Sequence, residues 1–168
     1  MTKARKGFIG DIFLYIIILF SMAIVLIAIG LVWSKLSDSF GSDANIPQEA
    51  KDIINLQATK FPKIWDGWAV LAVIGYIIAI VITAMNIRSH PVFAIFALIL
   101  LIVLGVVSVY LSNTYRTFIT STADLSSVAD DFTMYNFIMD KLPYIIVSLG
   151  IVFIIILYAK TRQQAFMI

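Results

Sequence analysis

Four long runs of apolar residues decide what this chain can fold into. They cover residues 8–33, 68–87, 92–111 and 142–159. A helix of about 20 apolar residues crosses the roughly 30 Å hydrocarbon layer of a membrane. Each run therefore predicts a transmembrane helix, and the chain is expected to lie mostly in lipid.

Isoleucine and valine fill these runs, and in water both residues favour strands. In lipid, a strand leaves its backbone groups unpaired unless a barrel closes, and barrel strands alternate polar and apolar residues. These runs do not alternate. We predict an all-α integral membrane protein: a four-span transmembrane helix bundle of two helical hairpins, forming a single membrane domain over residues 1–168.

The composition agrees with a chain in lipid, since 61% of the residues are hydrophobic and only 13% are charged. A soluble domain carries about 25% charged residues. Cysteine is absent and there is one histidine, so thiolate chemistry and a histidine-built metal site are excluded. Spans two to four contain no Asp, Glu, Lys or Arg between their ends. We predict no catalytic, cofactor-binding or metal site, no nucleic acid partner and no enzymatic activity.

Basic residues gather at the two termini and in the turn after the second span, and they set the expected orientation. The loops on the opposite side, residues 34–67 and 112–141, hold nine acidic residues and six basic ones. Lys and Arg remain on the cytoplasmic side. Both termini are therefore predicted to lie on the cytoplasmic side of a cytoplasmic membrane. The basic residues concerned are Lys3, Arg5, Lys6, Arg88, Lys160 and Arg162.

Aromatic residues mark the other side of the membrane. Amphipathic rings prefer the headgroup layer, so aromatic residues at the outer ends of the spans are expected to act as interface anchors. They are Trp33, Trp65, Trp68, Tyr110 and Tyr144.

Each outer loop is predicted to hold an amphipathic helix of about four turns. In the first loop, Asn45 and Pro47 indicate a helix start and Pro62 a stop, and in the second Thr122 indicates a start. The apolar faces are a candidate surface for partner proteins; packing as a lid over the protein's own bundle is an equally weighted alternative. The candidate surface residues are Ile53, Ile54, Phe61, Leu125, Val128 and Phe132.

Small residues recur at helical spacing along the spans, where they allow helices to approach closely. This packing is expected within one bundle, although contact with other copies would follow the same physics. Shifting the chain by 75 residues aligns two pairs of these glycines, which raises the hypothesis of a duplicated hairpin. The predicted helix-packing residues are Gly30, Gly75, Ala79, Thr83, Ala97, Gly105 and Gly150.

In its size, its high isoleucine content and its lack of candidate catalytic or ligand-binding groups, the chain is similar to small multi-span proteins of membrane-containing bacteriophages. That resemblance implies a virion membrane protein. We expect a non-enzymatic structural subunit that contacts membrane lipid and the other subunits of an assembly, in a virion or as an accessory subunit of a cellular membrane complex. The alternative is a holin-like pore or a small channel formed by a homo-oligomer, because such proteins are also small and poor in charge.

Overall fold

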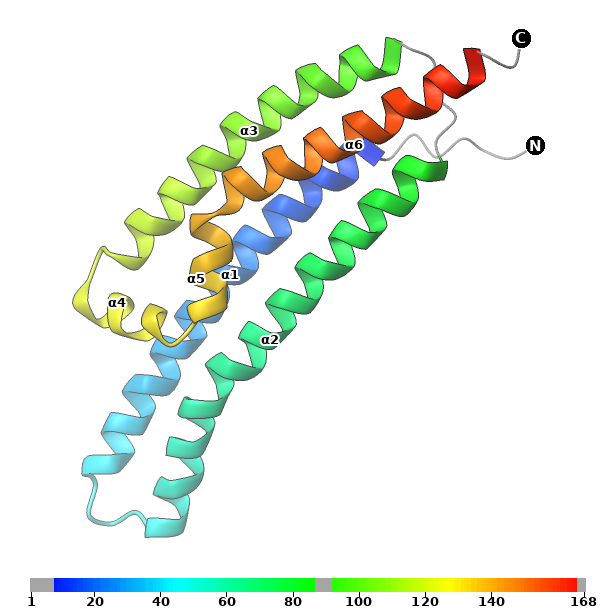
Figure 1. Cartoon of the computed structure of the whole chain (residues 1–168). Helices are drawn as coiled ribbons and strands as arrows, with labels where there is room; N and C mark the ends of the chain where they lie inside the picture. Colours follow the sequence, from blue (N-terminus) through cyan, green and yellow to red (C-terminus); the bar gives the residue numbers. More distant parts are fainter. Residues whose placement is uncertain (1–7, 87–91, 166–168) are drawn as a thin grey trace. The chain divides into compact units, whose positions relative to one another are not determined.

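The computed structural model describes residues 8–86 and 92–165, and within these ranges the chain is helical with no strand (Figure 1). This confirms the all-α prediction. Four of the helices are long and apolar enough to cross a membrane. The six helices are α1 (Phe8–Ser42), α2 (Gln48–Asn86), α3 (Val92–Ile119), α4 (Ala123–Asp130), α5 (Thr133–Asp140) and α6 (Leu142–Ala165).

Helix α1 is longer than its predicted span. It contains 35 residues, about 50 Å at 1.5 Å per residue, whereas a membrane core is roughly 30 Å thick. It runs on past Trp33 to Ser42, and a short turn then leads to α2. The predicted start of that helix is confirmed: the Asp43 carboxylate accepts a hydrogen bond from the Asn45 N–H at 2.8 Å, and the Pro47 carbonyl accepts one from Ala50 at 3.1 Å.

The predicted stop at Pro62 is wrong, because α2 continues through this proline to Asn86. Proline lacks the backbone N–H and crowds the preceding turn, which ends many helices. Here residues on both sides of Pro62 are held by contacts with other segments, described below, and the proline itself is buried. The first outer loop therefore contains no separate amphipathic helix: its helical residues are the end of α1 and the first half of α2.

The second outer loop forms two short helices in place of one. Its predicted start is confirmed, since Thr122 has an extended backbone and its hydroxyl accepts a hydrogen bond from the Leu125 N–H at 3.2 Å. The helix breaks after Asp130, where the Asp131 and Phe132 N–H groups donate to the carbonyls three residues earlier. Such tight closure is typical of a helix end, and α5 begins directly afterwards.

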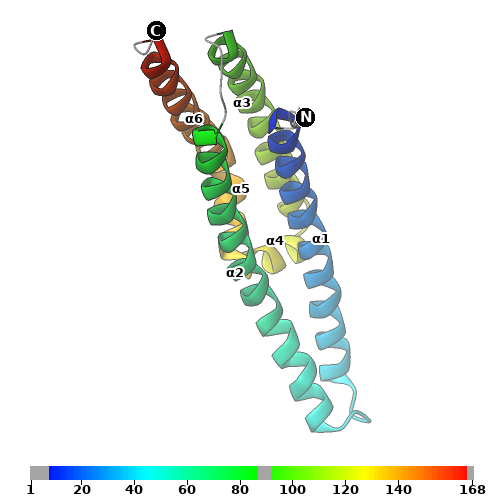
Figure 2. The same ribbon diagram turned by 90° about the vertical axis from the view of Figure 1, so that its right-hand side faces the viewer.

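The contacts within the chain divide the described residues into two compact units. Unit 1 comprises residues 8–66 and 114–139, and unit 2 comprises residues 67–86, 92–113 and 140–165. In unit 1, α1 and the first half of α2 form a helical hairpin, which Figures 1 and 2 both show, and α4 packs against α1. In unit 2, α3 and α6 pack against each other through small residues.

Candidate functional site

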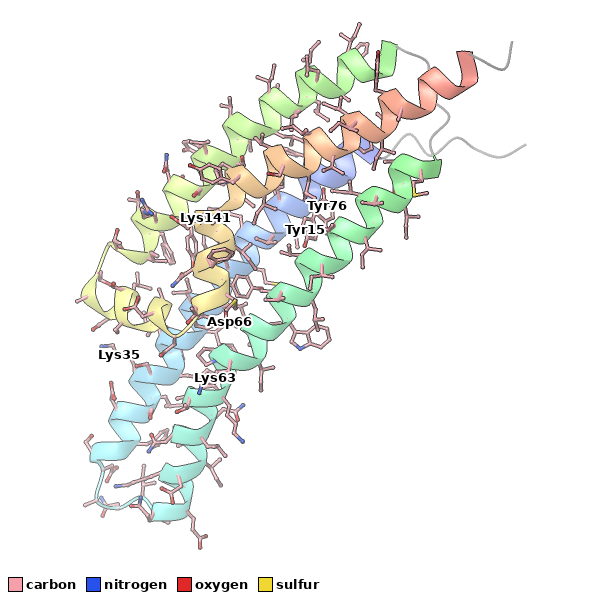
Figure 3. The ribbon with its side chains drawn as sticks, in the orientation of Figure 1. Tyr15, Lys35, Lys63, Asp66, Tyr76 and Lys141 are labelled. Atoms are coloured by element: carbon pink, nitrogen blue, oxygen red, sulfur yellow. The ribbon has the colours of Figure 1, made fainter. Side chains whose placement is uncertain are left out.

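Asp66 joins the two outer loops of the sequence. Its two carboxylate oxygens accept hydrogen bonds from the backbone N–H groups of Met134 at 2.9 Å and Tyr135 at 3.0 Å, the second and third residues of α5 (Figure 3). The first N–H groups of a helix lack partners within the helix, and a carboxylate there also interacts favourably with the helix dipole. Asp66 is buried, so a residue of α2 caps a helix far along the chain.

This role of Asp66 was not predicted, since the sequence places it with the other acidic residues of the outer loops. The residue directly before α5 is Phe132, whose side chain carries no hydrogen-bond acceptor, so α5 has no local cap of the usual kind. One feature of the sequence could have indicated this role. Asp66 lies between Trp65 and Trp68 at the edge of an apolar run, where an acidic residue is costly unless it has partners.

Tyr115 extends this polar connection to the end of α3. Its hydroxyl donates to the side-chain oxygen of Asn136 at 2.6 Å, and the Asn136 amide donates to the Ala129 carbonyl at 2.6 Å. The neighbouring Tyr135 is also buried, and this burial together with the nearby Asp66 carboxylate raises the pKa of its hydroxyl. The hydrogen bonds from Tyr115 to Asn136 and from Asn136 to Ala129 join α3, α5 and α4 to one another.

Phe132 is the apolar centre of unit 1 and is fully buried. Its ring packs edge-on against Phe61 of α2, with 6.2 Å between the ring centroids, and against Tyr135 at 6.5 Å. Gly30 of α1 supplies the space: a Cβ atom there would lie 2.9 Å from Val128 and 3.0 Å from the Phe132 ring. Edge-to-face aromatic packing and close backbone approach fix how the helices of unit 1 meet.

This packing places the six residues of the candidate partner surface in different environments. Val128 and Phe132 are buried within unit 1, where the chain's own packing covers them. Phe61 is half-buried against Phe132, and Ile54 and Leu125 are half-buried as well. Only Ile53 of the six is well exposed, at 67%. Helical periodicity identifies an apolar face, but it cannot distinguish a face that binds a partner from a face that the chain itself covers.

Two of the predicted packing glycines of unit 2, Gly105 and Gly150, fall at the contact between α3 and α6. The side chain of Leu101 occupies the space that a Cβ atom on Gly150 would need, and a Cβ on Gly105 would lie 3.7 Å from Val147. Ser108, one turn further along α3, is fully buried and its hydroxyl donates to the Gly105 carbonyl at 2.8 Å. Ala97 of the same helix is half-buried.

The small residues of α2 lie in a different environment. Among the described residues, and apart from Gly75, its chain neighbours and the adjacent backbone of its own helix, no atom comes within 4 Å of the position of a Cβ on Gly75. Ala79 is exposed, Thr83 is half-buried, and the Thr83 hydroxyl donates to the Ala79 carbonyl of its own helix at 2.6 Å. The glycines that a shift of 75 residues aligns, Gly30 with Gly105 and Gly75 with Gly150, thus have unlike surroundings.

The predicted interface anchors divide between the units. Trp68, Tyr110 and Tyr144 of unit 2 are well exposed, at 60%, 71% and 71%. Trp33 and Trp65 of unit 1 are half-buried, and Trp65 packs against Phe61 with 6.1 Å between the ring centroids. Exposed rings of this kind are compatible with the headgroup layer. The anchoring role stays a prediction.

Among the side chains that the structure describes, the charged groups other than Asp66 are exposed or half-buried. Lys35 of α1 forms an exposed ion pair with Asp124 of α4 at 2.6 Å, and Lys141 forms one with Asp140 at 3.0 Å. Across residues 8–86 and 92–165, no three His, Cys, Asp or Glu side chains form a group that could hold a metal ion. Of the basic residues used for orientation, Lys3, Arg5, Lys6 and Arg88 lie outside the described residues, as does Ile87 at the end of the second predicted span.

Comparisons with known protein families, with curated proteins and with solved structures found no match to this chain.

Proposed function

We propose that this protein is a non-enzymatic structural subunit of a larger membrane assembly, in a virion membrane or in a cellular membrane complex. Its four long apolar helices anchor it in lipid, and the outer part of unit 1 presents a surface to partner proteins. The observation that carries this proposal is the pair of hydrogen bonds from α5 to Asp66. They join two loops that the sequence separates by more than sixty residues into one folded body.

A folded body outside the spans supports a binding role on thermodynamic grounds. A surface that is already ordered loses less conformational entropy when a partner binds, so more of the contact energy contributes to affinity. The body also exposes apolar side chains that its own packing does not use, namely Ile53, Leu56 and Ile64 of α2.

The composition of the second, third and fourth spans supports anchoring over transport. Ion paths and proton relays in membranes are usually built from ionisable residues within the spans. Residues 67–86, 92–113 and 142–159 contain no Asp, Glu, Lys or Arg. With the basic termini on the cytoplasmic side, the hairpin end of unit 1 projects from the opposite face of the membrane.

The Phe132→Ala variant tests this function. It removes the centre of unit 1 but leaves the apolar helices unchanged, so we expect normal membrane insertion and loss of the proteins that co-purify in mild detergent. The matched control is Phe137→Ala, which removes an exposed ring of α5 and should retain the partners. Mass spectrometry of the co-purifying proteins is the measurement.

Two results would contradict the structural role. One is an unchanged set of co-purifying proteins in the Phe132→Ala variant. The other is leakage of a small dye from liposomes that contain only the purified chain, which would favour the pore.

Reversing the exposed charges of Asp130 and Asp131 to lysine gives a finer test: if α4 faces a partner, co-purification should weaken while unit 1 stays folded.

A further inference from the structure

The outer segment of α2 carries one continuous exposed face. Its residues share one side of the helix, and its opposite side packs within unit 1, where Asn55 hydrogen-bonds Ser37 of α1 and Phe61 contacts Phe132. The apolar members of the exposed face are 67%, 53% and 58% accessible. We call it the outer α2 face, and it consists of Glu49, Asp52, Ile53, Leu56, Lys60, Lys63 and Ile64.

The charges along the outer α2 face are arranged so that the face is complementary to a second copy of itself. The two acidic residues lie near the start of the helix, the two basic residues lie two to three turns later, and Leu56 is midway between them. An antiparallel copy related by a twofold axis at Leu56 brings Glu49 opposite Lys63 and Asp52 opposite Lys60. Because the two copies are related by a twofold axis, each of these ion pairs occurs twice in the interface. A parallel copy would instead place like charges opposite each other, which is repulsive.

The direction of the helix decides where such a copy can come from. Helix α1 runs unbroken from Phe8 to Ser42, so its outer end follows the direction of its membrane span. The outer segment of α2 lies alongside that end, held by the Ser37–Asn55 bond and by the Lys51 ammonium, which donates to the Gly41 carbonyl at 3.1 Å. Copies in one membrane therefore present this face in parallel, and an antiparallel copy must be anchored in a second membrane that faces the first.

We propose that the outer α2 face binds the outer α2 face of a second copy anchored in an apposed membrane, so that the protein joins two membranes. This inference rests on the proposed structural role and adds a specific partner to it. One pair of short helices buries less surface than a stable dimer interface of about 1,200 Å² or more. Each contact is therefore weak, and many copies facing one another supply the strength of attachment through multivalency.

Clustering of vesicles measures this contact. The purified full-length chain is reconstituted into neutral phosphatidylcholine vesicles, and their association is followed by dynamic light scattering. We expect clustering that weakens as salt is added, because exposed ion pairs are screened. Vesicles that stay dispersed at low salt would overturn the proposal, whereas the structural role is judged separately by co-purification with other proteins.

Charge reversal makes the test specific. Glu49→Lys with Asp52→Lys leaves the face wholly basic, and Lys60→Glu with Lys63→Glu leaves it wholly acidic. We expect each double variant alone to lower clustering by about tenfold or more, and a mixture of the two kinds of vesicle to cluster again. The matched control is Asp130→Lys with Asp131→Lys, which changes the net charge equally away from the face and should cluster as the natural sequence does.

Disulfide cross-linking determines the orientation, since the chain contains no cysteine of its own. The Leu56→Cys variant places one thiol at the twofold axis and should form a dimer across vesicles. Vesicles with Glu49→Cys mixed with vesicles with Lys63→Cys should form the mixed dimer. Preferential cross-linking of Glu49→Cys with itself, or double variants that cluster undiminished, would overturn the antiparallel contact.

Discussion

Units 1 and 2 are held together by different means, although both are built from helices of one chain. In unit 1, polar groups far apart in the sequence bond to each other, as Asp66 does with α5, around a buried aromatic ring. In unit 2, α3 and α6 meet where Gly150 leaves space for Leu101, and Thr83 and Ser108 bond to carbonyls of their own helices.

The expected solvent of each region accounts for this difference: the part of unit 1 beyond the apolar run of α1 is expected to lie in water, and unit 2 is expected to lie in lipid. In water, burial of apolar rings drives association, and helix ends need capping because their backbone groups would otherwise be buried without partners. In lipid, apolar side chains gain little by leaving the solvent, so helices associate through close fit at small residues. Unit 1 is thus expected to respond most to loss of its centre and caps, and unit 2 to added volume.

The largest expected effect is that of Phe132→Ala on unit 1. Truncating a fully buried aromatic residue removes its contacts and leaves a cavity, at a cost of about 3–5 kcal/mol. Hydrogen exchange should show lost protection at the amides of α5 and unchanged protection at the α3–α6 contact. Equal loss in both units would contradict the division, and Phe137→Ala serves as the exposed control.

The Asp66→Ala variant should have the second-largest effect on the stability of unit 1. It leaves the N–H groups of Met134 and Tyr135 without their acceptor, which costs about 2–3 kcal/mol. Asp66→Asn keeps one acceptor oxygen, so its cost should be about half as large. Exchange rates of these two amides are the measurement, with the exposed Asp38→Ala as control. Protection that survives Asp66→Ala would show that the carboxylate is not the cap.

Glycine substitutions test unit 2. An alanine at position 150 must displace Leu101, and overpacking of this kind costs about 1–3 kcal/mol. Gly105→Ala is the matched control, because its methyl group would meet Val147 at 3.7 Å, an ordinary contact distance. Thermal unfolding in detergent should separate the two variants, and equal melting temperatures would argue against the close approach of α3 and α6.

The smallest effect is expected at Gly75, where the structure leaves open space. Alanine favours a helix over glycine by about 0.5–1 kcal/mol, so Gly75→Ala should be neutral or slightly stabilising in the single chain. The same thermal unfolding measures it. Marked destabilisation would mean that another helix covers this position in the membrane.

Much of the helical structure could be read from local residue order. The apolar runs, the Asn45–Pro47 start and the Thr122 cap depend on neighbours in the sequence, and all three predictions agree with the structure. The predicted stop at Pro62 was wrong because contacts that α2 makes with other segments of unit 1 outweigh the local tendency of proline to end a helix. The division of the second outer loop into α4 and α5 was missed because the cap of α5 comes from Asp66.

The sequence by itself determined that the chain is helical and that four of its helices are suited to lipid, because an apolar run of that length must satisfy its backbone groups internally. Only the tertiary structure decided which acidic residue is buried and which apolar faces the chain covers. Asp66 with α5 and Gly30 with Phe132 are contacts between residues distant in the chain. Periodicity describes a single helix, whereas burial depends on what packs against it.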